Sequence, residues 1–349
     1  MTEKLIISID GGGTKTVAVA VTTEGKAVGW GESGPGNHVL APIEVVKESL
    51  RSAVAQAVTD AHAAMDDVLI IAGDTAGVGH NREGAVYVEG LIGEYYPETP
   101  IHITGDMVAG FLGALPQAEE TGGVVATAGT GSSIYGRNPS GEGLQVGGWG
   151  HIMGDEGSGY DIAVMGLRAA AKAFDGRGKP TSLTEAFPPH FGVGDMFLVQ
   201  VPVYIGEILT HEEIEEGTAE EVNYGSGLSR ERISKAATIV AQEAEKGDAV
   251  ARDVMARAAE ELALAVVTVA RRLGMTRPDL LVSYAGGVFK AGDVLLEPFG
   301  ACIIREYPDA KIVPPRLPVV GGGVKIAADE LGLDFSKMLP RLTEELRRM

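Results

Sequence analysis

The sequence predicts an α/β protein made of two related lobes with a cleft between them. Strands and helices alternate along the first part of the chain, which is typical of α/β architecture. A glycine-rich hairpin between two strands occurs twice, about one domain length apart, which indicates two related halves. Since no low-complexity tract or long linker is found, we expect the lobes to be tightly joined.

Composition and charge exclude several classes of protein. Of 349 residues, 49 are glycine, without the three-residue period of collagen, and the apolar share of 45% argues against disorder. We therefore expect the excess glycine in turns. The net charge of −19 disfavours binding to nucleic acid and to anionic membranes, so the expected partners are small or metal-bound. The single cysteine, Cys302, excludes an internal disulfide.

The N-terminal segment and the apolar stretches indicate a cytoplasmic protein. The first ten residues include two acidic ones and only a short apolar run, which is not typical of a signal peptide. The longest apolar stretches, such as 264–270, are far shorter than the ~20 residues of a membrane-spanning helix.

The first lobe, expected over 1–117, begins with strands at 5–9 and 16–21 that enclose the first glycine turn. Because no helix follows these glycines, they do not form a Rossmann or Walker phosphate loop. We expect Asp74 in a turn. Apolar spacing predicts helices over 42–65, 81–95 and 107–115, and strands over 68–72 and 101–104.

The second lobe, expected over 118–349, repeats the opening pattern and then becomes mostly helical. Strands at 123–127 and 133–135 enclose the second glycine turn. Gly321 to Gly323 are expected as a ligand-facing loop before a helix over 324–330, and the last helix is expected to pack back on the first lobe. Apolar spacing also predicts helices over 162–173, 229–246 and 249–273, and a strand over 280–284.

The two glycine hairpins carry residue types suited to metal-bound phosphate. Asp10 can hold Mg²⁺ through water, while glycine amides and the Thr14 hydroxyl can contact phosphate oxygens. An ordinary hairpin uses the same residue types for conformational reasons alone. The matching hairpin at 128–132 favours phosphate binding, since a polyanion needs several converging donors.

Two further segments suggest a substrate site. Asp106 ends a strand and precedes a helix, where an Asp either caps the helix or takes a proton from a substrate hydroxyl. Segment 147–158 places Trp149, His151 and two acids among glycines, which lets backbone and carboxylate approach a sugar closely. Its alternative is a tight loop with an acidic pair that caps the next helix.

These motifs, in order along nearly the whole chain, resemble the N-acetylglucosamine kinases of the BadF/BadG/BcrA/BcrD branch of the sugar kinase, Hsp70 and actin superfamily. The most specific is Gly-Gly-Trp-Gly-His-Ile-Met-Gly-Asp-Glu-Gly-Ser at 147–158. The others lie at 9–16, 36–38, 104–106, 128–132, 285–290 and 320–323.

The resemblance implies a two-lobed actin-like (ribonuclease H-like) fold and ATP- and Mg²⁺-dependent phosphorylation of the 6-hydroxyl of N-acetylglucosamine by a homodimer. It makes Asp106 the general base and Asp10 the acid associated with Mg²⁺. The sugar would contact Asn37, Asp106, Ser132, Ser133, Gly148, Trp149, Gly150 and Asp155. The nucleotide would contact Gly12, Gly13, Thr14, Lys15, Gly129, Thr130, Gly131, Gly286 and Gly287.

Other functions share part of this pattern. A glucosamine, broad hexosamine or N-acetylmuramic acid kinase would have the same phosphate loops and differ only around the sugar. The family's ATPase activators of 2-hydroxyacyl-CoA dehydratases need cysteines for a bridging iron–sulfur cluster, which Cys302 alone does not provide. A non-catalytic sugar sensor is disfavoured because no DNA-binding extension accompanies the motifs.

Overall fold

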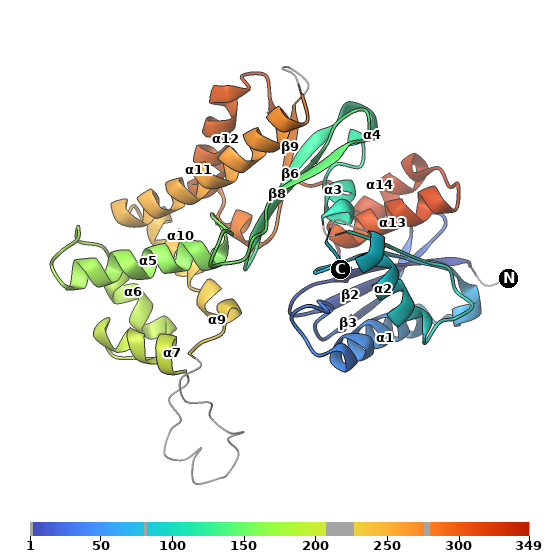
Figure 1. Cartoon of the computed structure of the whole chain (residues 1–349), viewed down its shortest axis with the longest axis horizontal. Helices are drawn as coiled ribbons and strands as arrows, with labels where there is room; N and C mark the ends of the chain where they lie inside the picture. The colour runs from blue at the N-terminus through green and yellow to red at the C-terminus, as the bar shows by residue number, and fades with distance from the viewer. Residues whose placement is uncertain (1–2, 80–81, 106, 207–226, 276–279, 349) are drawn as a thin grey trace, which may run out of the picture. The chain divides into compact units, whose positions relative to one another are not determined.

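The computed structural model describes residues 3–79, 82–105, 107–206, 227–275 and 280–348 (Figure 1). The chain forms two compact units. The first contains Met1–Val125, Tyr135–Gly143 and Val313–Met349, and the second contains Ala126–Ile134 and Leu144–Ile312. The second unit is thus inserted in the sequence of the first. The cleft expected between the lobes stays a prediction.

The first unit is built on a five-stranded sheet with the strand order β3-β2-β1-β4-β5. Neighbours β1, β2 and β3 are antiparallel, whereas β4 runs parallel to both β1 and β5. The strand–glycine turn–strand prediction is confirmed, and β3 was not predicted. The strands are β1 (Leu5–Gly11), β2 (Thr16–Thr22), β3 (Ala27–Ser33), β4 (Val68–Thr75) and β5 (Ile101–Thr104).

Helices cover both faces of this sheet. Alternate residues of β1 face opposite sides, so Ile7 and Ile9 join a core with α1 and α2, while Ser8 contacts α13. The helices are α1 (Ile43–Asp60), α2 (Arg82–Gly93), α3 (Val108–Ala114), α4 (Ala118–Thr121), α13 (Val319–Glu330) and α14 (Phe335–Leu346), and a 3₁₀ turn, η1, spans Met65–Asp67.

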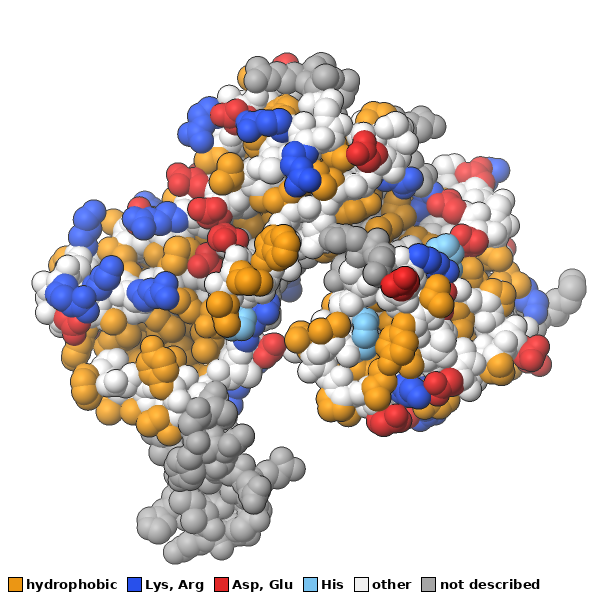
Figure 2. All heavy atoms as spheres, viewed as in Figure 1, with side chains coloured by type: hydrophobic (Ala, Val, Ile, Leu, Met, Phe, Trp, Pro, Cys, Tyr) orange, Lys and Arg blue, Asp and Glu red, His pale blue; other side chains and the backbone are white. Residues whose placement is uncertain are grey.

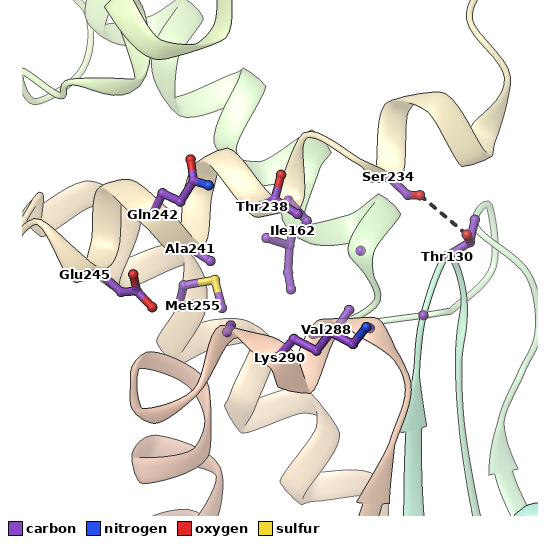
Figure 3. A pocket seen from close by; sticks show the side chains of 15 residues that line it. Thr130, Ile162, Ser234, Thr238, Ala241, Gln242, Glu245, Met255, Val288 and Lys290 are labelled. Carbon is purple, nitrogen blue, oxygen red and sulfur yellow. Dashed lines mark hydrogen bonds between the residues drawn. The ribbon is translucent and has the colours of Figure 1, made fainter. Parts of the chain in front are cut away.

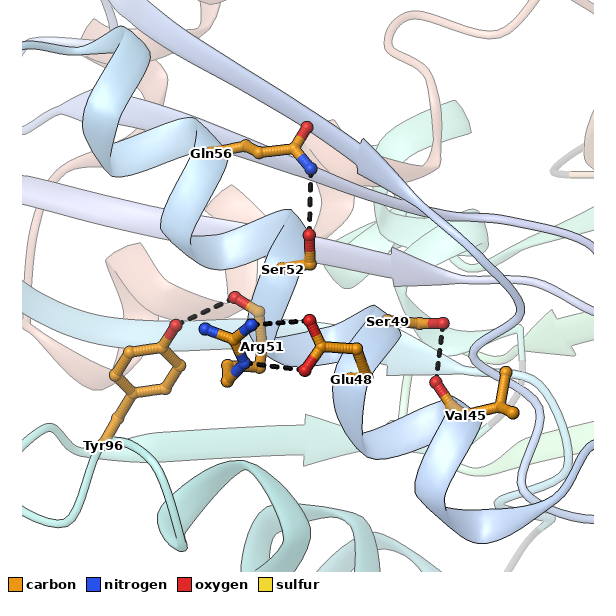
Figure 4. Close-up of polar contacts among 7 residues, drawn as sticks. All are labelled: Val45, Glu48, Ser49, Arg51, Ser52, Gln56 and Tyr96. Carbon is orange, nitrogen blue, oxygen red and sulfur yellow. Dashed lines mark hydrogen bonds and ion pairs between the residues drawn. The ribbon is translucent and has the colours of Figure 1, made fainter.

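Polar contacts occur along the solvent-facing side of α1 (Figure 4). The Arg51 guanidinium forms two hydrogen bonds with the Glu48 carboxylate, of 2.8 and 2.5 Å. The Tyr96 hydroxyl donates to the carbonyl oxygen of Arg51 at 2.9 Å, which ties the segment after α2 to α1. Such exposed pairs add little stability, so the buried face of α1 holds the helix in place.

The expected loop at Gly321 to Gly323 is wrong, because all three glycines lie inside α13 and are buried. A Cβ on Gly322 would overlap the carbonyl oxygen of Ala109 in α3, and one on Gly323 would overlap the Ser8 hydroxyl. These glycines therefore serve close packing of α13 against α3 and β1.

The second sheet has the strand order β10-β9-β6-β7-β8. Its strands are β6 (Gly123–Ala128), β7 (Ser132–Arg137), β8 (Gly143–Gly147), β9 (Leu281–Ala285) and β10 (Lys311–Ile312). Strands β6 and β7 confirm the predicted second hairpin, and β9 confirms the strand predicted after residue 279. The parallel pairing of β9 and β10 extends the sheet at one edge.

The rest of the second unit is mostly helical. The single helix expected over 229–246 is wrong, since α9 ends at Ser234 and α10 begins at Ala237. Of the apolar positions whose spacing predicts α11, Val254, Ala258, Leu262 and Val266 are buried and Val250 is half-buried. The elements are α5 (Gly159–Phe174), α6 (Leu183–His190), η2 (Phe197–Val199), α7 (Gln200–Ile205), α9 (Arg230–Ser234), α10 (Ala237–Glu245), α11 (Ala249–Arg272), η3 (Gly287–Ala291) and α12 (Asp293–Glu306).

The surface of the second unit includes an apolar region near α5 and α7. Phe174, Phe197 and Tyr204 are exposed there and line a groove of about 620 Å³, and apolar side chains gather on this part of the surface in Figure 2. Within the described ranges, none of the helices has the length and apolarity to cross a membrane.

Candidate active site

The first glycine hairpin joins β1 to β2 and exposes its tip. The Gly12 amide donates to the carbonyl oxygen of Lys15 at 2.7 Å, and the Gly36 amide donates to that of Gly12 at 2.9 Å. Gly13, Thr14 and Lys15 are exposed, so their polar groups are accessible. The Lys15 ammonium lies 2.9 Å from the Glu32 carboxylate, which places this predicted nucleotide contact in an exposed ion pair.

Two carboxylates occupy neighbouring strands behind this hairpin. Asp10 is the second-last residue of β1, and Asp74 lies opposite it in β4. Burial raises the pKa of Asp10 to about 6, against a smaller opposing effect of the Lys15 ammonium. The turn expected at Asp74 is wrong: because β4 continues to Thr75, this side chain is buried within the sheet.

The other predicted residues of the first unit are Asn37 and Asp106. Asn37 is buried, and its side-chain oxygen accepts a hydrogen bond from the Val39 amide at 2.9 Å, which fixes the loop after the Gly36 turn. Asp106, the predicted general base, lies outside the described residues. Its role stays a prediction.

The second glycine hairpin is bound to the start of α5. The Gly129 amide donates to the carbonyl oxygen of Gly131, and the Gly159 amide donates to that of Gly129, both at 2.8 Å. Gly286 lies against the backbone of Ala128, just before the hairpin. Two of the predicted nucleotide segments, 129–131 and 286–287, therefore meet within one unit.

A pocket of about 630 Å³ opens beside this hairpin (Figure 3). Gly129, Thr130 and Gly287 line it together with polar side chains of α10 and the apolar Met255 and Val288. The α10 residues are Thr238, Gln242 and Glu245, which were not predicted. Their spacing of four and three residues puts them on one face of the helix. This polar stripe was the only feature of the sequence that could have indicated these pocket residues.

The segment 147–158 also contacts this hairpin. The Ser132 hydroxyl donates to the carbonyl oxygen of Glu156 at 2.7 Å. Asp155 is 4% exposed and has a left-handed backbone with φ of 60°, which is unusual for a residue other than glycine. Its Oδ2 lies 3.0 Å from Nη2 of Arg230, the first residue of α9. Arg230 was not predicted as a site residue.

Ser133, Gly148 and Gln145 form a second contact between the hairpin and this segment. A Cβ placed on Gly148 would lie 2.7 Å from Gln145 Nε2 and 3.1 Å from Ser133 Oγ. Ser133 Oγ and Gln145 Oε1 are buried and have no hydrogen-bond partner among the described residues. Buried polar atoms of this kind indicate a ligand or ordered water. Gln145 was missed because nothing in the sequence around it is distinctive.

The remaining predicted sugar contacts, Trp149 and Gly150, lie in the turn that follows. Trp149 is 69% exposed, and the amide of Gly154 donates to the carbonyl oxygen of Gly150 at 2.8 Å. The structure therefore brings Ser132, Ser133, Gly148 and Asp155 next to the second hairpin and leaves the indole of Trp149 accessible to solvent.

Residues 7–322 match the model of the BadF/BadG/BcrA/BcrD ATPase family. The chain belongs to this family. It is 31% identical over 331 residues to an N-acetylmuramic acid/N-acetylglucosamine kinase of Clostridium acetobutylicum, which covers 94% of this chain and 99% of that one. It is also 26% identical to an N-acetyl-D-glucosamine kinase of Dictyostelium discoideum over 90% of this chain and 94% of that one.

Solved structures show the fold of this family member. A crystal structure from Chromobacterium violaceum, provisionally assigned as an N-acetylglucosamine kinase, matches with a TM-score of 0.66 and 23% identity, over 92% of this chain and 98% of that one. A ROK family glucokinase of Streptomyces griseus, solved with glucose and AMPPNP, matches with a TM-score of 0.57 and 17% identity, over 93% and 98% of the two chains. The predicted actin-like fold, with two mixed five-stranded sheets, is confirmed.

Proposed function

We propose that the chain is an ATP-dependent kinase that phosphorylates the 6-hydroxyl of an N-acetylated amino sugar, with N-acetylglucosamine as the main substrate. One observation carries the proposal: the second hairpin lines a nucleotide-sized pocket and also contacts the segment of Asp155. Phosphoryl transfer needs the two substrates to be held at one place. The relatives named above support an amino sugar as the acceptor.

The nucleotide would occupy the pocket of Figure 3. Its adenosine would lie between Gly287 and the polar face of α10, and its phosphates would reach the amides of Gly129 to Gly131. The volume of about 630 Å³ lies within the range of roughly 300–1,000 Å³ that is usual for small-molecule pockets. Gly12 to Lys15 would contact the phosphates from the first hairpin.

The sugar would be held by side chains that can bind hydroxyl and amide groups. Ser133 Oγ and Gln145 Oε1 would gain partners from the sugar, and Asp155 Oδ1 would accept from a hydroxyl. Asn37, Ser132, Trp149 and Gly150 complete the proposed sugar contacts. Asp106 would take the proton of the 6-hydroxyl as its oxygen bonds to the γ-phosphorus and ADP leaves.

The residues around Asp10 fit a bound Mg²⁺. Mg²⁺ is often held by one or two carboxylates together with substrate phosphates and water, and Asp10 and Asp74 supply carboxylates at adjacent strands. The raised pKa of Asp10 indicates a carboxylate whose negative form lacks sufficient compensation, which a cation would supply. When bound, the ion would neutralise charge on the phosphates.

A homodimer and a cytoplasmic location also stay predictions.

The test is ADP release with Mg-ATP and a panel of sugars. We expect N-acetylglucosamine to stimulate release strongly. The other sugars in the panel are N-acetylmuramic acid, glucosamine, N-acetylmannosamine and glucose. Their rates show how much the acetamido and lactyl groups matter for the reaction. If no sugar stimulates release, the chain is not a sugar kinase. A panel in which glucosamine gives the highest kcat/KM would contradict the acetylated substrate.

A further inference from the structure

Arg230 is a half-buried cation that contacts both the second hairpin and the segment of Asp155. It begins α9, and its Nη2 lies 3.0 Å from the Oδ2 atom of Asp155. A Cβ placed on Gly131 would lie 2.5 Å from the same Nη2 and 2.7 Å from Asp155 Oδ2. The guanidinium therefore lies against the second hairpin and beside the proposed sugar carboxylate at the same time.

The Arg230 guanidinium has an unused donor at this position. Its Nε atom is buried and has no hydrogen-bond partner among the residues that the structure describes. Leaving a charged N–H group buried and unpaired is unfavourable, and most buried donors in proteins have an acceptor. The ion pair with Asp155 uses Nη2 and leaves this requirement unmet.

The surroundings favour an oxyanion as the missing acceptor. Arg binds phosphate and carboxylate oxygens through several N–H groups held in one plane. The neighbouring Gly131 belongs to the hairpin whose Gly129 and Thr130 line the nucleotide-sized pocket. An oxyanion at Arg230 Nε would thus lie next to the expected position of the nucleotide phosphates.

We infer that Arg230 binds the phosphoryl group of ATP while it is transferred to the sugar. This inference rests on the proposed function. The bond between the γ-phosphorus and the β,γ-bridging oxygen breaks, the bond to the sugar oxygen forms, and the hydroxyl proton leaves with the base. Arg230 stays protonated throughout and stabilises the negative charge on the transferred group. Its Nη2 keeps Asp155 in place for the sugar.

The test replaces Arg230 and measures rate and binding separately. Arg230→Gln should lower kcat by roughly 10²- to 10³-fold, as expected when a transition-state donor is lost. By calorimetry, the dissociation constant of ADP should change by less than about threefold, and that of N-acetylglucosamine should rise much less than kcat falls, because Arg230 also holds Asp155. Arg230→Lys keeps the charge, so it should recover part of the rate. If the Gln variant fails to fold, the Lys variant takes its place in the test. Arg232→Gln, on the same short helix with an exposed side chain, is the matched control.

Three results would overturn the inference. One is a kcat for Arg230→Gln within about threefold of the unchanged protein. Another is a loss of sugar affinity as large as the loss of rate, which would mean that Arg230 acts only by holding Asp155. The third is a loss confined to N-acetylmuramic acid, which would assign the oxyanion to the lactyl carboxylate of that sugar. If the unchanged protein shows no sugar-dependent ADP release, the proposed function itself fails.

Discussion

Asp10 and Asp74 lie opposite each other in the parallel register of β1 and β4, so two acidic side chains share one end of the first sheet. Neighbouring carboxylates in a partly buried position disfavour each other's charge unless a cation lies between or beside them. Burial raises the pKa of Asp10 to about 6, against a smaller opposing effect of the Lys15 ammonium.

This arrangement predicts a specific pH dependence of stability without metal. Because the folded protein raises the pKa of Asp10 from 3.8 to about 6, the folded state binds the proton more tightly, and stability should fall as pH rises from about 4 to 6. Asp10→Asn removes this effect and should raise the free energy of unfolding at pH 7 by on the order of 2 kcal/mol in EDTA. Urea unfolding at pH 4 and 7 measures the difference, which should nearly vanish at pH 4. An equal gain at both pH values would contradict the assignment.

Gly131 should tolerate no side chain. A Cβ at this position would lie 2.5 Å from Arg230 and 2.7 Å from Asp155, so Gly131→Ala should separate the pair or displace the hairpin. We expect kcat/KM for the sugar to fall by at least about 100-fold, since small displacements in an active site are costly. Gly194→Ala is the control for adding a methyl group without crowding, because a Cβ there meets no atom within 4 Å and the residue belongs to none of the proposed sites. A Gly131→Ala enzyme with unchanged kinetics would exclude the tight contact.

Gln145 should contribute to sugar binding and not to stability. Gln145→Leu removes a buried oxygen without a protein partner, so the free energy of unfolding should stay the same or rise slightly. The KM for the sugar should rise by roughly 10- to 100-fold, while the KM for ATP should not change. Steady-state kinetics and a urea titration of the same preparation measure both effects. A loss of stability without an increase in sugar KM would assign a structural role to Gln145.

A bulky residue in the pocket of Figure 3 should block the nucleotide. Ala241 lines this pocket on α10, so Ala241→Phe should raise the dissociation constant of ADP by at least about tenfold and leave that of the sugar unchanged. Ala301→Phe, at an exposed position of α12, controls for the added apolar surface. Calorimetry with ADP and with the sugar separates the two effects. Equal ADP affinities in both variants would place the nucleotide elsewhere.

The glycines of α13 should be essential for stability. Gly322→Ala would push a methyl group into the Ala109 carbonyl and should cost roughly 1–3 kcal/mol. Gly90→Ala, inside α2, adds a methyl that meets nothing within 4 Å and should stabilise by roughly 0.5–1 kcal/mol. Chemical denaturation of both variants gives the comparison. Two stabilised proteins would show that α13 does not pack closely on α3.

The strands and helices with a regular apolar pattern could be predicted, and those with many glycines could not. β1, β2 and α11 bury long runs of apolar side chains, which their sequences show directly. In β3, Gly29 and Gly31 interrupt the apolar alternation because α1 packs closely against them. The glycines of α13 suggested a loop for the same reason. Close packing between elements leaves no trace in local periodicity.

The candidate site could be predicted only where its residues form a local motif. Ser132, Gly148 and Asp155 belong to recognisable segments, and the structure brings these segments together. Arg230 and Gln145 stand in unremarkable surroundings and join the site only through the tertiary fold. The Arg230–Asp155 pair spans 75 positions of the sequence, and no spacing rule relates residues that far apart.

The segments of the first unit are synthesised at different times, and this affects how the nascent chain can fold. Strands β1 and β4 leave the ribosome early, but α13, which covers one face of them, follows only after the whole inserted second unit. Until then the Ser8 side of the sheet has no helix over it, so the nascent first unit exposes an apolar face while the second unit can already fold. A chain that ends at residue 312 and is held on a stalled ribosome by a flexible linker long enough to clear the exit tunnel should therefore carry a folded second unit and a first unit that is still sensitive to protease.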